Sequence, residues 1–441
     1  MNTKKFFEKA LEAGITSSQL VISQSTATSF SLFHREIDSY SVEGNQGVIA
    51  SGIFDGKYGT ASSDRIDDSI IDFLIKGIID SAEISERNDC LDIFPGSPKY
   101  KKKRFYNEEL EKTPMVEKIS MMKDVEDSLF KIGDDVDDVQ EVAYCEVYAT
   151  RLFCNSYGLK LKDKKNYYSI YASIALKRGE ETKTSGYSFL ETDLKKFDKE
   201  KFVNKIYSEG EKKFGGTQCP AGKYPTLLDR DVFEDLVSYF MAANSSIAVQ
   251  KNSSFLAGLE GEKVASSKLT IDDVPLKKGP AYEYFDGEGV AQHNQKIVNH
   301  GVLITHFYNR ETAKKANRET TGHAVGGLGK LGVSATNIVV RPSKLSKEEL
   351  IKDVKLGVYI TEVAGLGTGI NNASGDFSCQ AEGFMIRDGK IAEPLDLITL
   401  AGNLLKMFKD IKNVDNNLDD CLVGTCTPDV LIKSMSIGGK N

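Results

Sequence analysis

The chain has 441 residues and a net charge of −7, and hydrophobic residues make up 40% and charged residues 27% of it. This composition is ordinary for a soluble globular protein and excludes an intrinsically disordered one. At about 150 residues per domain, the length predicts about three domains. The acidic balance argues against direct binding of nucleic acid, because a phosphate-binding protein normally carries a basic footprint. The one basic run, residues 101–104 (KKKR), is interpreted as a solvated linker.

Nothing in the sequence predicts export or a membrane. The N-terminal stretch MNTKKFFEKALEAG lacks the apolar core and the small-residue cleavage site of a signal peptide. No apolar run approaches the ~20 residues that span a bilayer. The seven cysteines are scattered and odd in number, which does not suggest a disulfide framework. We therefore expect a cytoplasmic protein with no membrane partner.

Helical and strand-like patterns follow the same order twice in the first half of the chain. The first pass predicts a helix over 3–13, a helix capped by Asp67 or Asp68 and, between them, strands at 19–23, 29–34, 37–42, 47–54 and 58–62. The second predicts a helix over 114–131, a helix capped by Asp198 and strands at 139–148, 150–155, 158–162, 167–176 and 181–190. This order indicates two duplicated units, each a helix, an antiparallel meander and a second helix.

The remaining sequence is rich in short strands and glycine turns. One long helix is predicted over 229–243, with shorter ones at about 347–354 and 400–408. Asp55-Gly56 and Asp388-Gly389 predict hairpin turns, because glycine accepts a positive φ there. Strands separated from helices favour an α+β fold rather than a parallel α/β one. We predict an N-terminal α+β domain at 1–100, a central α+β domain at 105–215 and a C-terminal β-rich domain at 219–441.

Familiar catalytic and nucleotide-binding motifs are absent or out of context. Residues 327–332 (GLGKLG) match GxGxxG, but a strand-like segment ending in Pro342 follows where the dinucleotide fingerprint needs a helix. None of the five histidines precedes a glutamate, so neither HExxH nor HExxxH occurs. Acidic residues beside glycine could pair as general acid and base but are more often turn formers: Asp286, Glu288, Asp376 and Glu382.

A histidine pair leaves one metal-binding alternative open. The even separation of His300 and His306 predicts that they share one face of a strand. Cys379, Cys421 or Cys426 could join them as soft metal ligands. The spacing matches no standard zinc site, however, and surface or core histidines are the commoner interpretation.

Three segments carry a resemblance to one family. Residues 285–316 (FDGEGVAQHNQKIVNHGVLITHFYNRETAKKA), with Thr321-Gly322-His323-Ala324 after them, resemble the C-terminal region of the TldD/PmbA family, also called the modulator of DNA gyrase family. Residues 365–408, beginning GLGTGINNASGDFS, resemble its second signature, and residues 55–82 are similar to its first domain. The likeness covers nearly the whole chain, and the three segments occur in the family's order.

The resemblance implies a particular role. One branch of the family, TldD, carries HExxxH on a helix early in the C-terminal domain and binds a catalytic zinc ion there. The other branch, PmbA or TldE, lacks those ligands and pairs with TldD as a heteromeric protease acting on peptides and unfolded chains. Residues 229–243 correspond to the motif helix, where Phe233, Glu234 and Ser238 stand at degenerate motif positions. The turn at 374–378 (SGDFS) is similar to the PmbA branch.

The first hypothesis is therefore a PmbA/TldE-type subunit of a TldD/TldE metalloprotease. It implies no catalytic residue, metal or cofactor in this chain, a TldD-like partner that supplies zinc, and a homodimer as one form of the isolated chain. The family-like turns suggest six substrate-binding residues: Asp286, Glu288, Asn309, Arg310, Ser374 and Asp376.

Two alternatives remain at this stage. One is a self-sufficient metallopeptidase with an atypical site of His300, His306 and a cysteine. The other is a non-enzymatic binding protein that modulates gyrase or toxin–antitoxin proteins. The family's older name motivates the second alternative, and no residue does.

Overall fold

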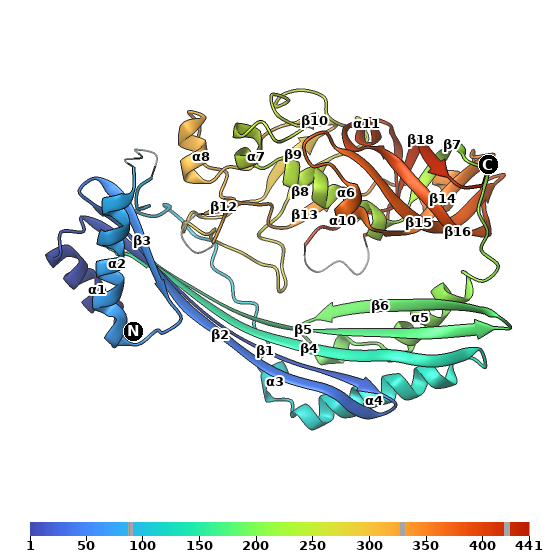
Figure 1. Cartoon of the computed structure of the whole chain (residues 1–441), viewed down its shortest axis with the longest axis horizontal. Coiled ribbons are helices and arrows are strands. Elements are labelled where there is room, and N and C mark those ends of the chain that lie inside the picture. The colour runs from blue at the N-terminus through green and yellow to red at the C-terminus, as the bar shows by residue number, and fades with distance from the viewer. Residues whose placement is uncertain (87, 89–90, 327–330, 419–423, 441) are drawn as a thin grey trace.

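A computed structural model describes residues 1–441 except 87, 89–90, 327–330, 419–423 and 441. A six-stranded antiparallel sheet occupies the first half, in the order β3-β2-β1-β4-β5-β6 (Figure 1). Its strands are β1 Ser17–Phe33, β2 Glu36–Phe54, β3 Lys57–Ser63, β4 Val136–Asn155, β5 Lys160–Arg178 and β6 Glu181–Glu191. The two predicted meanders thus join through β1 and β4 into one sheet, which confirms the duplicated α+β arrangement.

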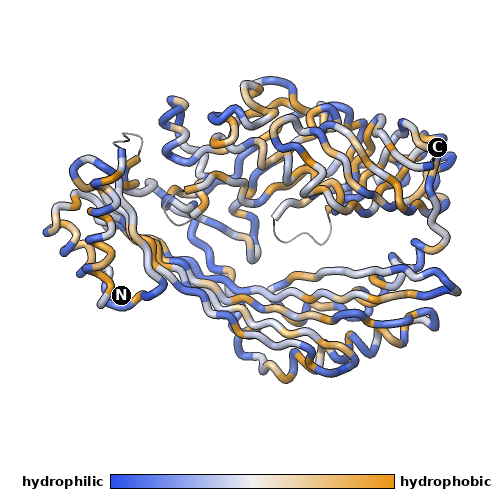
Figure 2. The backbone as a smooth tube through the Cα atoms, in the orientation of Figure 1, coloured by the Kyte–Doolittle hydropathy of each residue, from blue (hydrophilic) through white to orange (hydrophobic). Residues whose placement is uncertain are grey.

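Helices cover one face of this sheet. Along β1 the residues Leu20, Phe30 and Leu32 are buried, whereas Ser25 and Ser29 lie on the other face. Figure 2 shows this interleaving of hydrophobic and hydrophilic residues along the long strands. The apolar face packs against two helix pairs, each with its own core: α1 Thr3–Glu12 with α2 Ile71–Ile84, and α4 Met115–Lys131 with α5 Lys199–Glu211. The polar face of the sheet lies toward the C-terminal half.

The strands are longer than the sequence predicts. Predicted strands 139–148 and 150–155 form the single strand β4, and the polar residues 43–46 continue within β2. Backbone ladders do not require apolar side chains, and these segments lie where one face is open to solvent. The chain instead turns at His34 and Arg35, both with positive φ, so the predicted strand 29–34 ends one residue early.

A second six-stranded sheet forms the C-terminal half, in the order β16-β15-β14-β7-β18-β17, and β16 also pairs with β18. Its strands are β7 Gly222–Leu228, β14 Leu356–Ala364, β15 Asp376–Arg387, β16 Lys390–Asn403, β17 Ile411–Val414 and β18 Val430–Gly438. Helix α6, Arg230–Ala243, packs against this sheet, and its Phe240 ring stacks on Phe408 with centroids 4.1 Å apart. The predicted helix 229–243 is confirmed.

Smaller elements complete this half. A four-stranded sheet contains β8 Ile271–Asp273, β9 Gln295–Asn299, β10 Val302–Leu303 and β13 Ile338–Val340, and a two-stranded one contains β11 Ala324–Val325 and β12 Gly332–Val333. The short helices are η1 Asp68–Ile70, α3 Glu108–Lys112, η2 Leu194–Lys196, α7 Ser246–Gln250, α8 Arg310–Lys315, α9 Lys347–Ile351, α10 Leu366–Gly369 and α11 Leu404–Lys409. The predicted helix at 400–408 begins only at Leu404, because residues 400–403 remain paired in β16.

No helix in the described part of the chain is both long enough and apolar enough to cross a membrane.

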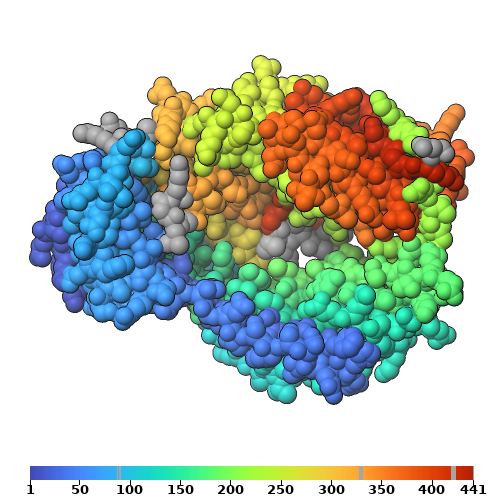
Figure 3. Space-filling model, viewed as in Figure 1, coloured from blue at the N-terminus to red at the C-terminus, as the bar shows by residue number. Residues whose placement is uncertain are grey.

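The C-terminal half contacts the long sheet at two places of different chemistry. At one, Phe153 and Leu161 of the sheet form an apolar cluster with Tyr282, Tyr284 and Phe285. At the other, two ion pairs cross the boundary, Lys183–Asp396 at 2.6 Å and Lys213–Glu362 at 2.5 Å. Figure 3 shows the molecule hollowed between these contacts.

A buried ion pair fixes α4 on the sheet. The Lys118 ammonium pairs with Glu146 and donates to the Leu110 carbonyl at 2.9 Å, and Glu146 also accepts from the Tyr144 hydroxyl at 2.9 Å.

We expect Lys118→Met to lower the free energy of unfolding by about 3–5 kcal/mol, because it leaves the Glu146 carboxylate buried without a cation. The double change Lys118→Met with Glu146→Leu should lose less. Urea denaturation measures both, and a Lys118→Met protein of wild-type stability would contradict the prediction.

Candidate functional site

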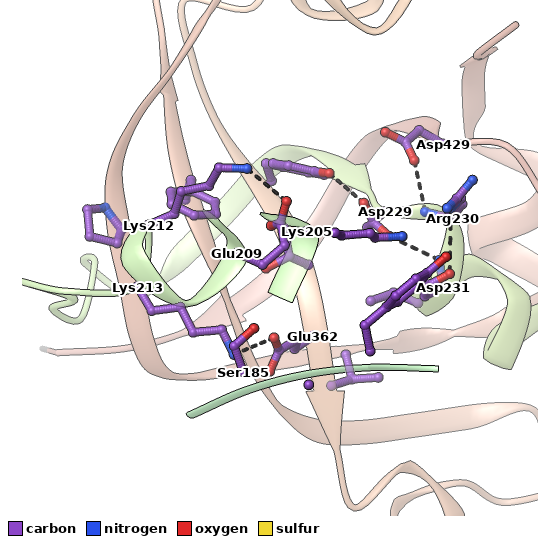
Figure 4. A pocket seen from close by; sticks show the side chains of 18 of the residues that line it. Ser185, Lys205, Glu209, Lys212, Lys213, Asp229, Arg230, Asp231, Glu362 and Asp429 are labelled. Atoms are coloured by element: carbon purple, nitrogen blue, oxygen red, sulfur yellow. Dashed lines mark hydrogen bonds and ion pairs between the residues drawn. The ribbon is translucent and has the colours of Figure 1, made fainter. Parts of the chain in front are cut away.

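A cavity of about 1230 Å³ lies between the long sheet and the C-terminal half. One wall comes from α5 and the end of the sheet, with Tyr171, Ser173 and Gly186 among its residues. The opposite wall comes from the first turns of α6 and from β14 to β16 (Figure 4). The cavity therefore exists only because segments far apart in sequence pack together.

The α5 wall is basic. Lys201, Lys205, Lys212 and Lys213 line it. Lys212 forms an ion pair with Glu209 at 2.8 Å, and Lys213 forms one with Glu362 on the opposite wall. Figure 4 shows Lys205 and Asp231 pointing toward one another from opposite walls. This wall can attract carboxylates.

The α6 wall is acidic because the helix is divided into two faces. Asp231, Glu234 and Asp235 lie three and four residues apart, so they share the face that lines the cavity. The other face is buried in the core: Val232, Phe233, Leu236, Val237 and Phe240. Asp229 caps the helix by accepting from the Asp231 amide at 3.1 Å, and it also accepts from the Tyr359 hydroxyl at 2.5 Å.

The pKa of each of the three carboxyl groups on this face is raised, by burial first and by neighbouring carboxylates second. Burial, reinforced by the charges of Asp231 and Asp235, raises the pKa of Glu234 to about 7. Burial and then neighbouring carboxylates also raise the pKa of Asp231 and Asp235. Carboxyl groups that share a partly buried surface without enough cations titrate late in this way. Perturbed acids in a cavity are typical of functional sites.

A second group of charges lies at the base of the cavity. Lys347 pairs with Asp429 at 2.7 Å, and the Asp429 carboxylate also accepts from the Arg230 amide at 2.9 Å. Burial and the charge of Asp229 raise the pKa of Asp429 to about 6. Burial lowers the pKa of Lys347, but the carboxylates of Asp429 and Asp229 outweigh it, so that pKa is raised overall. Sequence analysis did not indicate Lys347 and Asp429, because they are remote from α6 in the chain and belong to no motif.

The degenerate motif positions lie in different environments. Phe233 is 0% exposed and packs against Phe408, 5.6 Å away between ring centroids. Glu234 faces the cavity. Ser238 is exposed, and its hydroxyl lies 3.2 Å from the Thr425 hydroxyl. Neither a benzyl ring in the core nor a hydrogen-bonded hydroxyl is a usual zinc ligand. The residues at these positions do not fit a zinc site.

Four of the predicted substrate-binding residues lie together outside this cavity, in segments that hydrogen bonds connect. The buried Asp286 accepts from the amides of Glu288, Val290 and Ala324, at 2.9, 2.9 and 3.2 Å. Glu288 in turn accepts from the Arg310 amide at 2.8 Å. Asn309 caps α8 through the Thr312 amide at 2.8 Å.

Burial raises the pKa of Asp286 to about 6 and, together with the charge of Asp286, raises that of Glu288 to about 7. The Arg310 side chain pairs with Asp92. Asp286 also lines a second, smaller cavity of about 430 Å³. Through these bonds the FDGEG turn holds α8 and β11 together within the C-terminal half.

The other two predicted residues are elsewhere. Ser374 donates to Asp376 at 2.8 Å, and Asn403 donates to the same carboxylate at 2.9 Å. Both hydrogen bonds lower the pKa of Asp376, and the one from Asn403 has the larger effect. The turn is exposed and is not among the residues that line the large cavity.

The histidine pair does not share a strand face. His300 occupies the β9–β10 turn with a φ of 47°, and its Nδ1 lies 3.3 Å from the Ser267 carbonyl. His306 follows β10, is buried, and contacts the Asn244 side chain at 2.8 Å through Nδ1. The prediction that strand alternation aligns them is wrong, because the hairpin turn falls on His300 itself.

The remaining parts of the metal and nucleotide alternatives gain no support. Cys379 is buried in the core of the C-terminal half, and Cys421 lies outside the described residues. Residues 327–330 of the GLGKLG segment also lie outside them. Among the described residues, no group of three or more His, Cys, Asp or Glu side chains is arranged to hold a metal ion.

Because its pKa is raised, Glu234 should make the free energy of unfolding depend on pH. Between its usual pKa of 4.5 and its folded value of about 7, the folded protein holds a proton that the unfolded chain has released. Stability therefore falls as pH rises through this window. We expect Glu234→Gln to raise the free energy of unfolding by about 1–3 kcal/mol at pH 8 and by nothing at pH 4. Denaturation at both pH values, with Glu83→Gln on α2 as control, measures this; an equal effect at both would contradict it.

The core position of Phe233 makes a second prediction. Installing histidines by Phe233→His with Ser238→His should not create a zinc site, because residue 233 points into the core and the burial of a polar ring destabilises α6. We expect a lower melting temperature and no zinc retained after dialysis, measured by mass spectrometry with the single Ser238→His variant as control. One tightly held zinc ion per chain would show that α6 can rotate both residues into the cavity.

Models of one protein family match two segments of this chain. The PmbA/TldA metallopeptidase C-terminal domain model matches residues 221–439, and the PmbA/TldA metallopeptidase central domain model matches residues 108–209. The metalloprotease PmbA homolog of Haemophilus influenzae is 25% identical over 466 residues, covering 98% of this chain and 94% of that protein. Metalloprotease PmbA of Escherichia coli O157:H7 is 32% identical over 219 residues, 49% of this chain and 46% of that protein.

A solved structure agrees with these relatives. A Thermotoga maritima protein named for modulation of DNA gyrase superposes with a TM-score of 0.91 at 27% identity, covering 99% of both chains. The two matched segments cover most of the chain, and the fold agrees over nearly its whole length. This chain belongs to the PmbA/TldD family of metallopeptidases.

Proposed function

We propose that this chain is the PmbA/TldE-type subunit of a two-component metalloprotease that acts in the cytoplasm on peptides and unfolded proteins. In this proposal it holds no catalytic zinc ion itself. A TldD-like partner supplies the metal and the glutamate base. The observation that carries the proposal is the cavity-facing surface of α6, which presents carboxylates and no imidazole.

The donor chemistry supports the absence of a zinc ligand set at this helix. A catalytic zinc site takes three protein ligands and keeps one position open for water. Here Phe233 is in the core, and Ser238 hydrogen-bonds with Thr425.

What this chain retains is suited to holding a substrate. The cavity has a basic wall and an acidic wall, and the edge strand β6 lines part of it. Such a surface can grip the backbone of an extended chain through hydrogen bonds that do not depend on sequence. A zinc ion held by the partner would supply Lewis-acid chemistry at the scissile carbonyl, and the residues of this chain would bind and orient the peptide.

The self-sufficient metallopeptidase loses its main argument, because His300 and His306 do not share a strand face. Binding to gyrase or to toxin–antitoxin proteins rests on a name that belongs to relatives. None of the described residues that line the cavity favours it.

The test is reconstitution. The purified chain, the TldD-like protein of the same organism and their mixture are incubated with an unfolded protein, and mass spectrometry follows the cleavage. We expect the chain alone to contain almost no zinc and to cleave nothing, and the mixture to cleave in a reaction that a zinc chelator stops. Robust, chelator-sensitive cleavage by this chain alone would overturn the proposal.

A further inference from the structure

The acidic face of α6 has too few cations. Lys205 faces Asp231, but no Lys or Arg in the described part of the chain forms an ion pair with Glu234 or Asp235. Like charges packed on one helix face repel and destabilise the folded protein. A cation bound from outside the chain would relieve this repulsion, because an opposite charge favours the ionised carboxylates.

A second, independent feature points the same way. Asp415, which lines the same cavity, is only 3% exposed, and its Oδ1 has no hydrogen-bond partner among the described residues. Buried carboxylate oxygens are nearly always satisfied, since an unpaired one costs about 1–3 kcal/mol or more. The nearby Lys347 is already paired with Asp429. Asp415 therefore adds to the lining of this cavity a carboxylate oxygen that no hydrogen bond in the described part of the chain satisfies.

The opposite side of the cavity offers a backbone. β6 pairs with β5 and is the last strand of its sheet, and no strand in the described part of the chain pairs with its other edge. Its cavity-lining residues include Thr184, Ser185 and Gly186, and of these the Thr184 carbonyl already accepts from Lys213 Nζ at 3.0 Å. Natural proteins usually protect such an edge with charges, prolines or bulges. An open edge inside a cavity can accept an extended segment as an added strand.

We infer that this cavity binds an extended peptide along the free edge of β6, with a basic group of that peptide, a Lys or Arg side chain or an amino terminus, held by Glu234 and Asp235. The inference rests on the proposed function and specifies its substrate class as cationic peptides. The lysines of α5 direct the basic group to α6, because they repel it from the other wall and attract carboxylates there instead.

Calorimetric titration of the full chain with capped seven-residue peptides tests this without a partner. The peptides alternate Thr and Val and carry Lys, norleucine or Glu at the centre. We expect the Lys peptide to bind at least about tenfold more tightly than its norleucine analogue, in the range for close charge pairs, and the Glu peptide to bind weakest. The preference should be larger at pH 8 than at pH 6, because Glu234 is then ionised.

Three controls make the result decisive. The double variant Glu234→Gln with Asp235→Asn should bind the Lys and norleucine peptides equally, whereas Asp80→Asn with Glu83→Gln, which removes the same charge from exposed positions of α2, should keep the preference. Circular dichroism verifies that each variant is folded. A Lys peptide N-methylated at every backbone nitrogen, which has no backbone N–H to donate to a strand edge, should bind at least about tenfold more weakly, since each lost hydrogen bond lowers affinity.

Equal affinity of the wild-type chain for the Lys and norleucine peptides would overturn the inference. So would a Lys preference that survives in the Glu234→Gln, Asp235→Asn variant. Stoichiometric binding of Zn²⁺ alone, abolished by the same two substitutions, would reassign the acidic face to a metal. Because these titrations measure binding by the single chain, they can succeed even if reconstituted cleavage fails, and fail even if it succeeds.

Discussion

The packing of α6 into the C-terminal core is the constraint on which the cavity depends. Phe233 and Phe240 hold the helix against Phe408, and this fixes its rotation about its own axis. Once the apolar stripe is buried, Asp231, Glu234 and Asp235 must face the other way. The charge of the cavity wall is thus a consequence of how the aromatic core is filled, and the raised pKa of Glu234 follows from that enforced neighbourhood.

The two contacts between the halves of the molecule give the cavity its shape. One contact is an apolar cluster around Tyr284 and Phe285, in which the Tyr284 hydroxyl also donates to the Lys162 carbonyl at 2.7 Å. The other depends on Lys183–Asp396 and Lys213–Glu362, at the rim of the cavity. Partly exposed ion pairs are weak and are screened by salt, whereas a buried aromatic cluster is not. The aromatic contact is therefore the more permanent of the two.

The family-like motifs have a structural use that their composition alone did not reveal. In FDGEG the Asp286 carboxylate is surrounded by three backbone amides, and Glu288 satisfies an amide at the start of α8. Acidic side chains that satisfy backbone donors hold irregular segments in place. This explains why a turn far from α6 is built of such specific residues, and it leaves the chemistry of the large cavity to other residues.

The sequence by itself determined the α+β class, the long helices and the Asp-Gly hairpins at 55–56 and 388–389, where the positive φ angles occur as expected. These features depend on side-chain periodicity and turn chemistry within one short segment, which a single sequence records directly. It also determined that no HExxxH motif exists. The lengths of the strands escaped prediction, because ladder pairing carries β2 and β4 through polar stretches.

Only the tertiary structure decided which charges meet. Lys205, Glu234 and Asp415 line one cavity, although nothing in the chain between them announces it. It likewise decided that His300 falls in a turn and that Phe233 faces the core. The physical reason is that a cavity arises where separate elements pack, so its composition depends on long-range contacts that no local pattern encodes.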